Sequence, residues 1–173
     1  TEGDSSVFTN NVITGTSSYL IHASSASNSV FSDNELTGTG RGIYANDAEG
    51  STITNNFVTT SGSEGFKMNY CHGCLFDSNT VANRPSIGIE ARYSDSLTVT
   101  NNNLDVYQYG MDVREGSMHL IDNNVVTNFE EYGIYFQSSE NSIVTFNHLT
   151  CINSGGWKRG INNTESNQYA IVN

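Results

Sequence analysis

The chain has 173 residues and a formal net charge of −11 at pH 7, from 18 acidic and seven basic side chains. This length fits one domain, and the charge argues against non-specific nucleic-acid binding, because phosphates need a basic surface. No run of about 18 apolar residues is present, so we expect no membrane span. The aromatic and β-branched residues recur at fixed intervals, which distinguishes the chain from a disordered polar sequence.

Seven asparagines recur at intervals of 22 or 23 residues: Asn11, Asn34, Asn56, Asn79, Asn102, Asn124 and Asn147. An apolar residue lies three positions before each, and another lies two positions after it. A third segment follows, usually opened by glycine, in which apolar and polar residues alternate, as in Gly88-Ile89-Glu90-Ala91. Alternation with period two indicates a strand with one buried face.

Three short strands per repeat predict an all-β parallel solenoid of about seven coils, each rising by about 4.8 Å. We expect the repeated asparagines to take the left-handed backbone of a sharp corner, which Asn tolerates, and their amides to bond along the stack. Residues 1–173 are interpreted as one domain. Because the chain starts abruptly and stops within the strand-like run Tyr169–Val172, we expect it to be part of a longer protein.

The asparagine column and the Gly-opened strands resemble the right-handed parallel β-helix superfamily of pectate-lyase-like proteins. This superfamily includes polysaccharide lyases, uronan epimerases and phage tailspikes. The resemblance covers essentially the whole chain and implies a right-handed parallel β-helix, with the asparagine corner between the second and third strands of each coil. It implies little about activity, since one fold supports many functions. In these families the loop before the Gly-opened strand walls the substrate groove.

The basic residues all fall on outward positions of the Gly-opened strands or in the loops before them: Arg41, Lys67, Arg84, Arg92, Arg114, Lys158 and Arg159. In an acidic chain this segregation predicts a face that attracts an anionic ligand. Stacking in register would place Glu90 beside Asp112, and Arg92 beside Arg114. A solvated ladder of ion pairs is one interpretation. Like charges side by side cost stability, however, and clustered ionisable groups are typical of functional sites.

The sequence therefore predicts binding of an acidic polysaccharide, such as alginate or pectate, with cleavage or epimerisation as an open question. The candidate catalytic residues are Lys67, Glu90, Arg92, Asp112, Arg114 and Tyr135. The arginines would neutralise a uronate carboxylate, and Lys67 or Tyr135 would transfer the proton. The candidate substrate-binding residues are Arg41, Tyr44, Asn69, Arg84, Tyr107, Tyr109, Tyr132, Gln137 and Trp157.

Glu90 and Asp112 are also candidate Ca²⁺ ligands, or the carboxyl pair of a retaining glycosidase. The motifs of polygalacturonase-like hydrolases, bacterial mannuronan epimerases and classical pectate lyases are absent, so the enzyme class stays open. The alternative is a non-catalytic β-helix that serves as a scaffold, an adhesin or a tailspike-like segment. Either function predicts a secreted or cell-surface protein, and the oligomeric state is open.

Cys71 and Cys74 form a lone CxxC unit, for which a local disulfide or a turn is favoured over zinc. The state of Cys151 is open. Of the histidines, His22 is expected to point inward, and His119 is expected to have a structural role near a corner. Asn162-Asn163-Thr164 matches the acceptor pattern for N-glycosylation.

Overall fold

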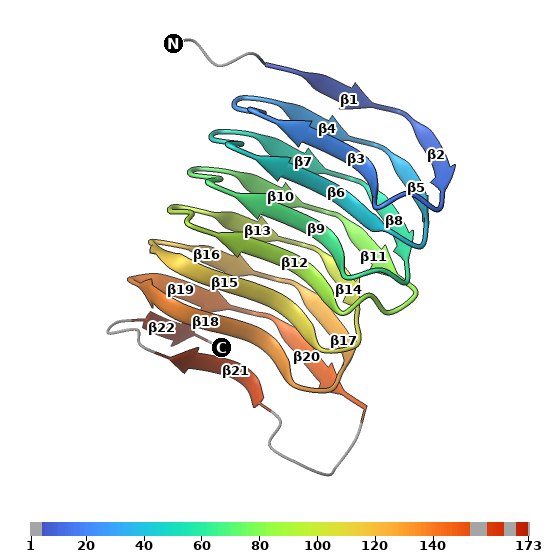
Figure 1. Ribbon diagram of the computed structural model, residues 1–173. Helices are drawn as coiled ribbons and strands as arrows, with labels where there is room; N and C mark the ends of the chain where they lie inside the picture. Colours follow the sequence, from blue (N-terminus) through green and yellow to red (C-terminus); the bar gives the residue numbers. More distant parts are fainter. Residues whose placement is uncertain (1–4, 153–158, 165–168, 173) are drawn as a thin grey trace.

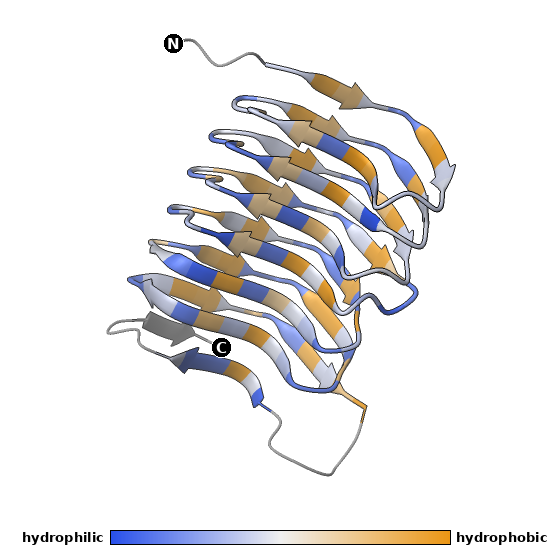
Figure 2. Ribbon diagram, viewed as in Figure 1, coloured by the Kyte–Doolittle hydropathy of each residue, from blue (hydrophilic) through white to orange (hydrophobic). Residues whose placement is uncertain are grey.

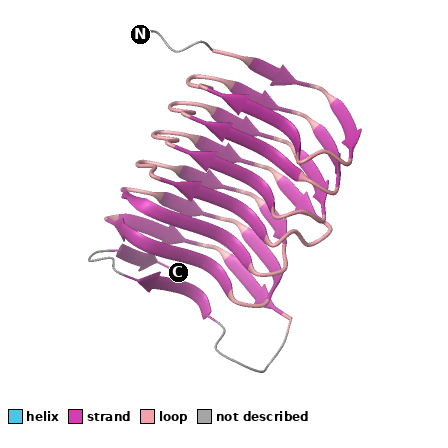
Figure 3. Ribbon diagram, viewed as in Figure 1, coloured by secondary structure: helices cyan, strands magenta, loops and turns pink. Residues whose placement is uncertain are grey.

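Stacked β-strands make up the fold. The computed structural model describes residues 5–152, 159–164 and 169–172, and these ranges contain 22 strands and no helix (Figures 1 and 3). The strands form three parallel sheets of eight, seven and seven strands, which we call sheets A, B and C. Within the described ranges there is accordingly no helix that could cross a membrane.

Each sheet takes one strand from every coil. Sheet A contains β1 (Val7–Thr9), β4 (Val30–Ser32), β7 (Thr52–Thr54), β10 (Leu75–Asp77), β13 (Thr98–Thr100), β16 (Leu120–Asp122), β19 (Ser142–Thr145) and β22 (Tyr169–Val172). Sheet B contains β2 (Val12–Gly15), β5 (Glu35–Gly38), β8 (Phe57–Thr60), β11 (Thr80–Ala82), β14 (Asn103–Asp105), β17 (Val125–Phe129) and β20 (His148–Cys151). Sheet C contains β3 (Tyr19–Ser24), β6 (Arg41–Asn46), β9 (Glu64–Asn69), β12 (Ile87–Arg92), β15 (Tyr109–Ser117), β18 (Tyr132–Glu140) and β21 (Arg159–Thr164).

The pairing register follows the sequence repeat. In sheet A, Phe76 lies opposite Ile53 on one side and Val99 on the other, and equivalent positions pair in the same way in the other sheets. These side chains point inward and are fully buried, as are Val58 of sheet B and Phe66 of sheet C. Figure 2 shows the resulting alternation of hydrophobic and hydrophilic residues along the strands. The predicted all-β parallel solenoid of about seven coils with three strands each is therefore confirmed.

The asparagine column forms a continuous hydrogen-bonded ladder inside the solenoid. Asn79 Nδ2 donates to Asn102 Oδ1 at 2.9 Å and to the Ile53 carbonyl at 2.8 Å. Asn79 Oδ1 in turn accepts from the backbone N–H of Asn56 at 3.0 Å and from Asn56 Nδ2 at 2.9 Å. Each buried amide thus serves its neighbours on both sides, as the sequence predicted.

The left-handed backbone belongs to a different residue from the one expected. It falls on the residue just before each column asparagine, with φ between 48° and 57°: Asn10, Asp33, Asn55, Ser78, Asn101, Asn123 and Phe146. The prediction that the column asparagines themselves adopt it is wrong. The preceding residue makes the turn, and the side chain of the column asparagine is directed into the interior, where it bonds to the neighbouring coils.

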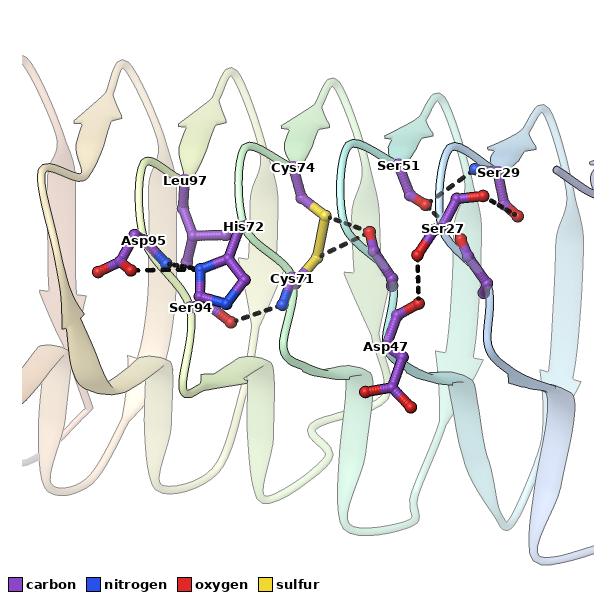
Figure 4. The surroundings of a disulfide bond; sticks show 12 residues. Ser27, Ser29, Asp47, Ser51, Cys71, His72, Cys74, Ser94, Asp95 and Leu97 are labelled. Atoms are coloured by element: carbon purple, nitrogen blue, oxygen red, sulfur yellow. Dashed lines mark hydrogen bonds and ion pairs between the residues drawn. A yellow bond between two sulfur atoms is a disulfide. The ribbon is translucent and has the colours of Figure 1, made fainter. Parts of the chain in front are cut away.

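A second corner connects sheet C to sheet A, and it contains a disulfide between Cys71 and Cys74, one of the two alternatives that the sequence left open (Figure 4). Their Cα atoms are 5.5 Å apart, and both residues are buried. The backbone N–H of Cys71 also donates to Ser94 Oγ of the next coil at 3.0 Å. The disulfide thus joins the two ends of one corner, while hydrogen bonds tie that corner to its neighbour.

His119 lies in the equivalent corner two coils further along the chain. Its ring is buried, its Nδ1 accepts the backbone N–H of Leu97 at 3.3 Å, and it stacks on Phe136 with centroids 6.3 Å apart. Burial lowers the pKa of His119 to about 4, against a small opposing effect of Asp95. The imidazole is therefore neutral in the folded protein near pH 7.

Replacing one ladder asparagine should destabilise the solenoid. Asn102→Ala removes an amide that accepts two hydrogen bonds from Asn79 and donates to Asn124, so buried polar groups in two coils lose partners. We expect a loss of about 3 kcal/mol in the free energy of unfolding, measured by urea denaturation. Asn103→Ala, at the exposed neighbouring position, should change it by less than about 0.5 kcal/mol. Equal effects of the two variants would contradict the ladder's role.

The free energy of unfolding should also decrease as the pH is lowered, because of His119. Its folded-state pKa of about 4 lies below the ordinary value of 6.5, so the unfolded chain binds more protons between these values. The corresponding stability is present above pH 6.5 and is lost as the pH falls toward 4, by about 3 kcal/mol in all. His119→Gln, which does not titrate, should flatten this part of a stability–pH profile. An unchanged slope in the variant would exclude His119 as its source.

Candidate functional site

The outward face of sheet C gathers most of the predicted site residues in three columns that run along the solenoid. The first column is Tyr19, Arg41, Glu64, Ile87, Tyr109, Tyr132 and Arg159. The second is His22, Tyr44, Lys67, Glu90, Asp112, Tyr135 and Asn162. The third is Ser24, Asn46, Asn69, Arg92, Arg114, Gln137 and Thr164. All six candidate catalytic residues lie in the second and third columns, on adjacent strands.

The sequence prediction placed His22 on the wrong face of its strand. His22 pairs with Tyr44 in the second column and is exposed, so the expectation that it points inward is wrong. In this terminal coil Ile21 is the buried residue. The next side chain along a strand must then point outward, because side chains alternate between the two faces.

In the centre of this face, carboxylates lie beneath cations. Glu64, Glu90 and Asp112 are between 0% and 5% exposed, although all three occupy outward positions. The side chains of the cations around them, which belong to Arg41, Lys67, Arg92 and Arg114, are between 20% and 38% exposed. The layer nearest to solvent is therefore positively charged, and the three carboxylates lie below it, closer to the strands.

Ion pairs hold this layered arrangement. Lys67 Nζ donates to both carboxylate oxygens of Glu90, at 3.1 and 3.0 Å. Arg114 forms a bidentate pair with Asp112, in which Nε and Nη2 each lie 2.7 Å from a carboxylate oxygen. Arg92 Nε lies 2.5 Å from Glu90 Oε1. Arg92 and Arg114 thus turn toward the acid on their own strands, which explains how Glu90 beside Asp112 and Arg92 beside Arg114 are tolerated.

Glu64 belongs to this network and was missed in the sequence. Arg41 Nε donates to it, and Lys67 Nζ lies 3.8 Å from its Oε1. It stands immediately before Gly65, at the position that Arg41 occupies before Gly42 in the preceding coil. Extending the outward pattern across the glycine would therefore have found it.

The two neighbouring glutamates have pKa values shifted in opposite directions. Burial raises the pKa of Glu64, and the nearby Glu90 adds to this, whereas Arg41 opposes it. Burial also disfavours the charged form of Glu90, but Lys67 and Arg92 outweigh it and hold the pKa of Glu90 below its ordinary value. Enzymes use such opposite shifts in pKa to make one carboxyl group a general acid and its neighbour a base. Here Arg41, Lys67 and Arg92 cover both carboxyl groups.

The carboxylates do not favour the predicted Ca²⁺ site. Within the described ranges no three His, Cys, Asp or Glu side chains converge as metal ligands. Glu90 and Asp112 instead face Lys67 and Arg114, and their oxygens are occupied by these donors. Calcium ions prefer six to eight oxygen ligands, so this donor set does not fit one. Ca²⁺ binding stays a prediction from the sequence.

Aromatic side chains flank the charged centre along the solenoid axis. At one end, the rings of Tyr19, His22 and Tyr44 have centroids 4.8 to 5.2 Å apart. The other end has a second cluster of similar spacing, 5.2 to 5.9 Å, formed by Tyr109, Tyr132 and Tyr135. Arginines lie over the outer members: Arg41 is 5.3 Å from the Tyr19 ring centroid, and Arg114 is 5.2 Å from that of Tyr135.

The remaining predicted residues lie outside the three columns or outside the described ranges. Arg84 and Tyr107 come from the loops before β12 and β15, where the guanidinium lies 5.4 Å from the ring centroid. Trp157 and Lys158 fall in the segment that is not described.

Asn162 of the glycosylation pattern is buried and accepts a hydrogen bond from Arg159 Nη1 at 2.6 Å, so its amide is not presented to solvent.

Removing a cation from the centre should test whether the network also supports the fold. Arg114→Ala leaves the buried Asp112 carboxylate without its bidentate partner, so we expect a loss of about 3 to 5 kcal/mol in the free energy of unfolding. The matched control is Arg84→Ala, because Arg84 pairs at 3.8 Å with the partly exposed Glu130. It should cost less than about 1 kcal/mol in the same denaturation experiment. A loss of less than about 1 kcal/mol for Arg114→Ala as well would contradict a stabilising role of the buried network.

Comparison with known proteins agrees with the fold. The family model described as right-handed beta helix region matches residues 1–147 and, in a second match, residues 88–173. The matches overlap because equivalent coils of a repeat can align in more than one register. No curated protein and no solved structure matches the chain. The matched ranges cover its whole length, and the chain belongs to the right-handed β-helix family.

Proposed function

We propose that the outward face of sheet C binds an acidic polysaccharide. The observation that carries this proposal is the layering of charge: four partly exposed cations cover three buried carboxylates. The protein as a whole carries −11, yet this face offers positive groups to a ligand. Such a local field draws an anion to one surface while the rest of the molecule repels it.

The types of cation suit carboxylate or sulfate groups repeated along a chain. Arg41, Arg92 and Arg114 carry planar guanidinium groups, which bind such anions with two parallel hydrogen bonds. The strands that carry them are stacked at about 4.8 Å per coil, so the cations are spread along the solenoid axis. A polymer with repeated negative charges would therefore meet several cations, whereas a small anion would meet one or two.

The aromatic clusters suggest how the polymer lies. Sugar rings stack on aromatic faces, and the two clusters, around Tyr44 and around Tyr132, lie at opposite ends of the charged centre. A chain that contacts both clusters must run parallel to the solenoid axis. The proposed ligand therefore crosses the coils from β3 to β18, with its charged groups over the cations between them.

Binding without turnover is the function that this geometry supports best. Glu90 and Asp112 are buried and paired, so neither carboxylate can reach a sugar carbon while its ion pairs persist. Lys67 Nζ donates to both oxygens of Glu90 as an ammonium group, which has no lone pair with which to take a proton. Tyr135 keeps a lyase or epimerase open as the second candidate, because it is half-buried and, among the described residues, has no carboxylate on its hydroxyl, which lies 3.1 Å from Thr164 Oγ1, with Arg114 over its ring.

The disulfide supports an extracellular location for this function. Disulfides persist mainly in secreted, periplasmic or surface-exposed proteins, because reducing systems open them in the cytosol. Cys71 and Cys74 form such a bond in a buried corner. We therefore extend the proposal to a secreted or cell-surface protein, where acidic polysaccharides are also found.

Binding to polygalacturonate and alginate, with neutral dextran as a reference, tests the proposal by isothermal titration calorimetry. Tyr44→Ala and Tyr132→Ala should each weaken binding about tenfold, from the loss of a stacking face. The double variant Arg41→Gln/Glu64→Gln removes one cation together with its buried partner, and it should weaken binding at low salt by a similar factor. Phe57→Ser, an exposed aromatic residue on sheet B, is the matched control and should bind as the wild type does.

Two outcomes would contradict the proposal: a folded protein that binds none of the acidic polymers, or one that binds dextran equally well. Turnover is followed in the same samples through the ultraviolet absorbance of unsaturated sugar ends and by proton NMR for epimerisation. Binding alone predicts no change in either signal. A signal that disappears in Tyr135→Phe would instead establish the second candidate, with Tyr135 in the reaction.

A further inference from the structure

A stacked pair of tyrosines lies on a different surface, at the corner between sheets C and A. Tyr70 and Tyr93 each follow the last residue of a sheet C strand, and their ring centroids are 5.1 Å apart with an interplanar angle of 15°. Their φ values are 51° and 54°, a left-handed conformation that is uncommon for bulky residues. The equivalent corner residues in other coils are Ser25, Asp47, Glu115 and Ser138, all with similar φ. The corner itself therefore does not require tyrosine.

The rings of this pair are partly exposed, and among the described residues no cation lies over them. Tyr70 is 45% and Tyr93 42% exposed. Three other tyrosines, Tyr19, Tyr107 and Tyr135, each have an arginine of this chain over the ring. In the part of the chain that the structure describes, no such arginine or lysine lies over Tyr70 or Tyr93. The exposed parts of these rings are therefore available to a cation of a ligand.

Carboxylates bracket the pair in the same column. Backbone hydrogen bonds from Asp47 to Asn69 and from Tyr93 to Arg114 set the register, which places Asp47 before Tyr70 and Glu115 after Tyr93. Both acids are exposed, and Asp47 accepts one hydrogen bond from Asn46 at 2.8 Å. This corner therefore has the opposite sign to the cationic face of sheet C.

We propose that Asp47, Tyr70, Tyr93 and Glu115 form a docking site for an arginine-rich segment of a partner protein. Cations are attracted to the tyrosine faces and to the flanking carboxylates. The site spans three coil spacings, about 14 Å, which exceeds the reach of a single guanidinium. An extended peptide of about five residues covers that length at about 3.3 Å per residue and can place one arginine at each end and one at the rings.

The probe is the acetylated and amidated peptide Arg-Gly-Arg-Gly-Arg, labelled with a fluorophore and titrated with the whole chain in an anisotropy assay. The wild type should bind it in a salt-dependent manner. Tyr70→Ser/Tyr93→Ser should weaken binding about fivefold, because the cation–π contact of the arginine at the rings is lost. The backbone should tolerate this change, since Ser25 and Ser138 occupy the same corner position with the same left-handed φ. Circular dichroism and the unfolding midpoint check that the variant is folded.

Further variants and ligands separate this site from general attraction and from the polysaccharide face. Asp47→Asn/Glu115→Gln should weaken peptide binding and flatten its salt dependence, whereas Tyr44→Ser on sheet C should leave it unchanged. Polygalacturonate binding should persist in Tyr70→Ser/Tyr93→Ser, so the failure of either proposal is visible without the other. Unchanged peptide affinity in Tyr70→Ser/Tyr93→Ser, absence of binding by the wild type, or equally tight binding of acetylarginine amide would overturn the docking site.

Discussion

The in-register stacking of one coil on the next is the interaction on which the rest of this structure depends. A single coil has no internal partner for most of its backbone N–H and C=O groups, and these are satisfied by the neighbouring coils. The asparagine ladder extends the same principle into the interior, where each amide, such as Asn79, bonds to the coils on both sides. Because the register is constant, the place of a residue in the repeat decides whether it is buried or presented to a ligand.

The same stacking constrains how charges are arranged on the surface. Residues in one column are neighbours at about 4.8 Å, so like charges there would repel. Arg92 and Arg114, which are neighbours in one column, avoid this by pairing along their own strands with Glu90 and Asp112. The short carboxylates then lie at the base and the longer cations reach solvent. A protein rich in acids can present a cationic face in this way without unpaired buried charges.

The corners give the solenoid a second kind of surface. They need only a residue that tolerates a left-handed backbone, and small or acidic side chains fill most of them. Where a corner carries a large aromatic side chain, as at Tyr70 and Tyr93, the side chain is free to serve another purpose. The proposed peptide site and the proposed polysaccharide face thus use separate parts of the repeat and carry opposite charge.

The sequence by itself determined the three strands per coil, the buried columns, the asparagine ladder and the face that collects the basic residues. A repeat of 22 or 23 residues and strict alternation fix these features before any packing is considered. Only the tertiary structure decided that Glu64 is buried beneath the cations and that His22 points outward. It also decided that Arg92 and Arg114 pair within their own strands, whereas Arg41 pairs with the next strand. The burial of Glu64 and the choice of ion-pair partner depend on side chains from adjacent coils, and the segment around His22 has apolar residues on both faces.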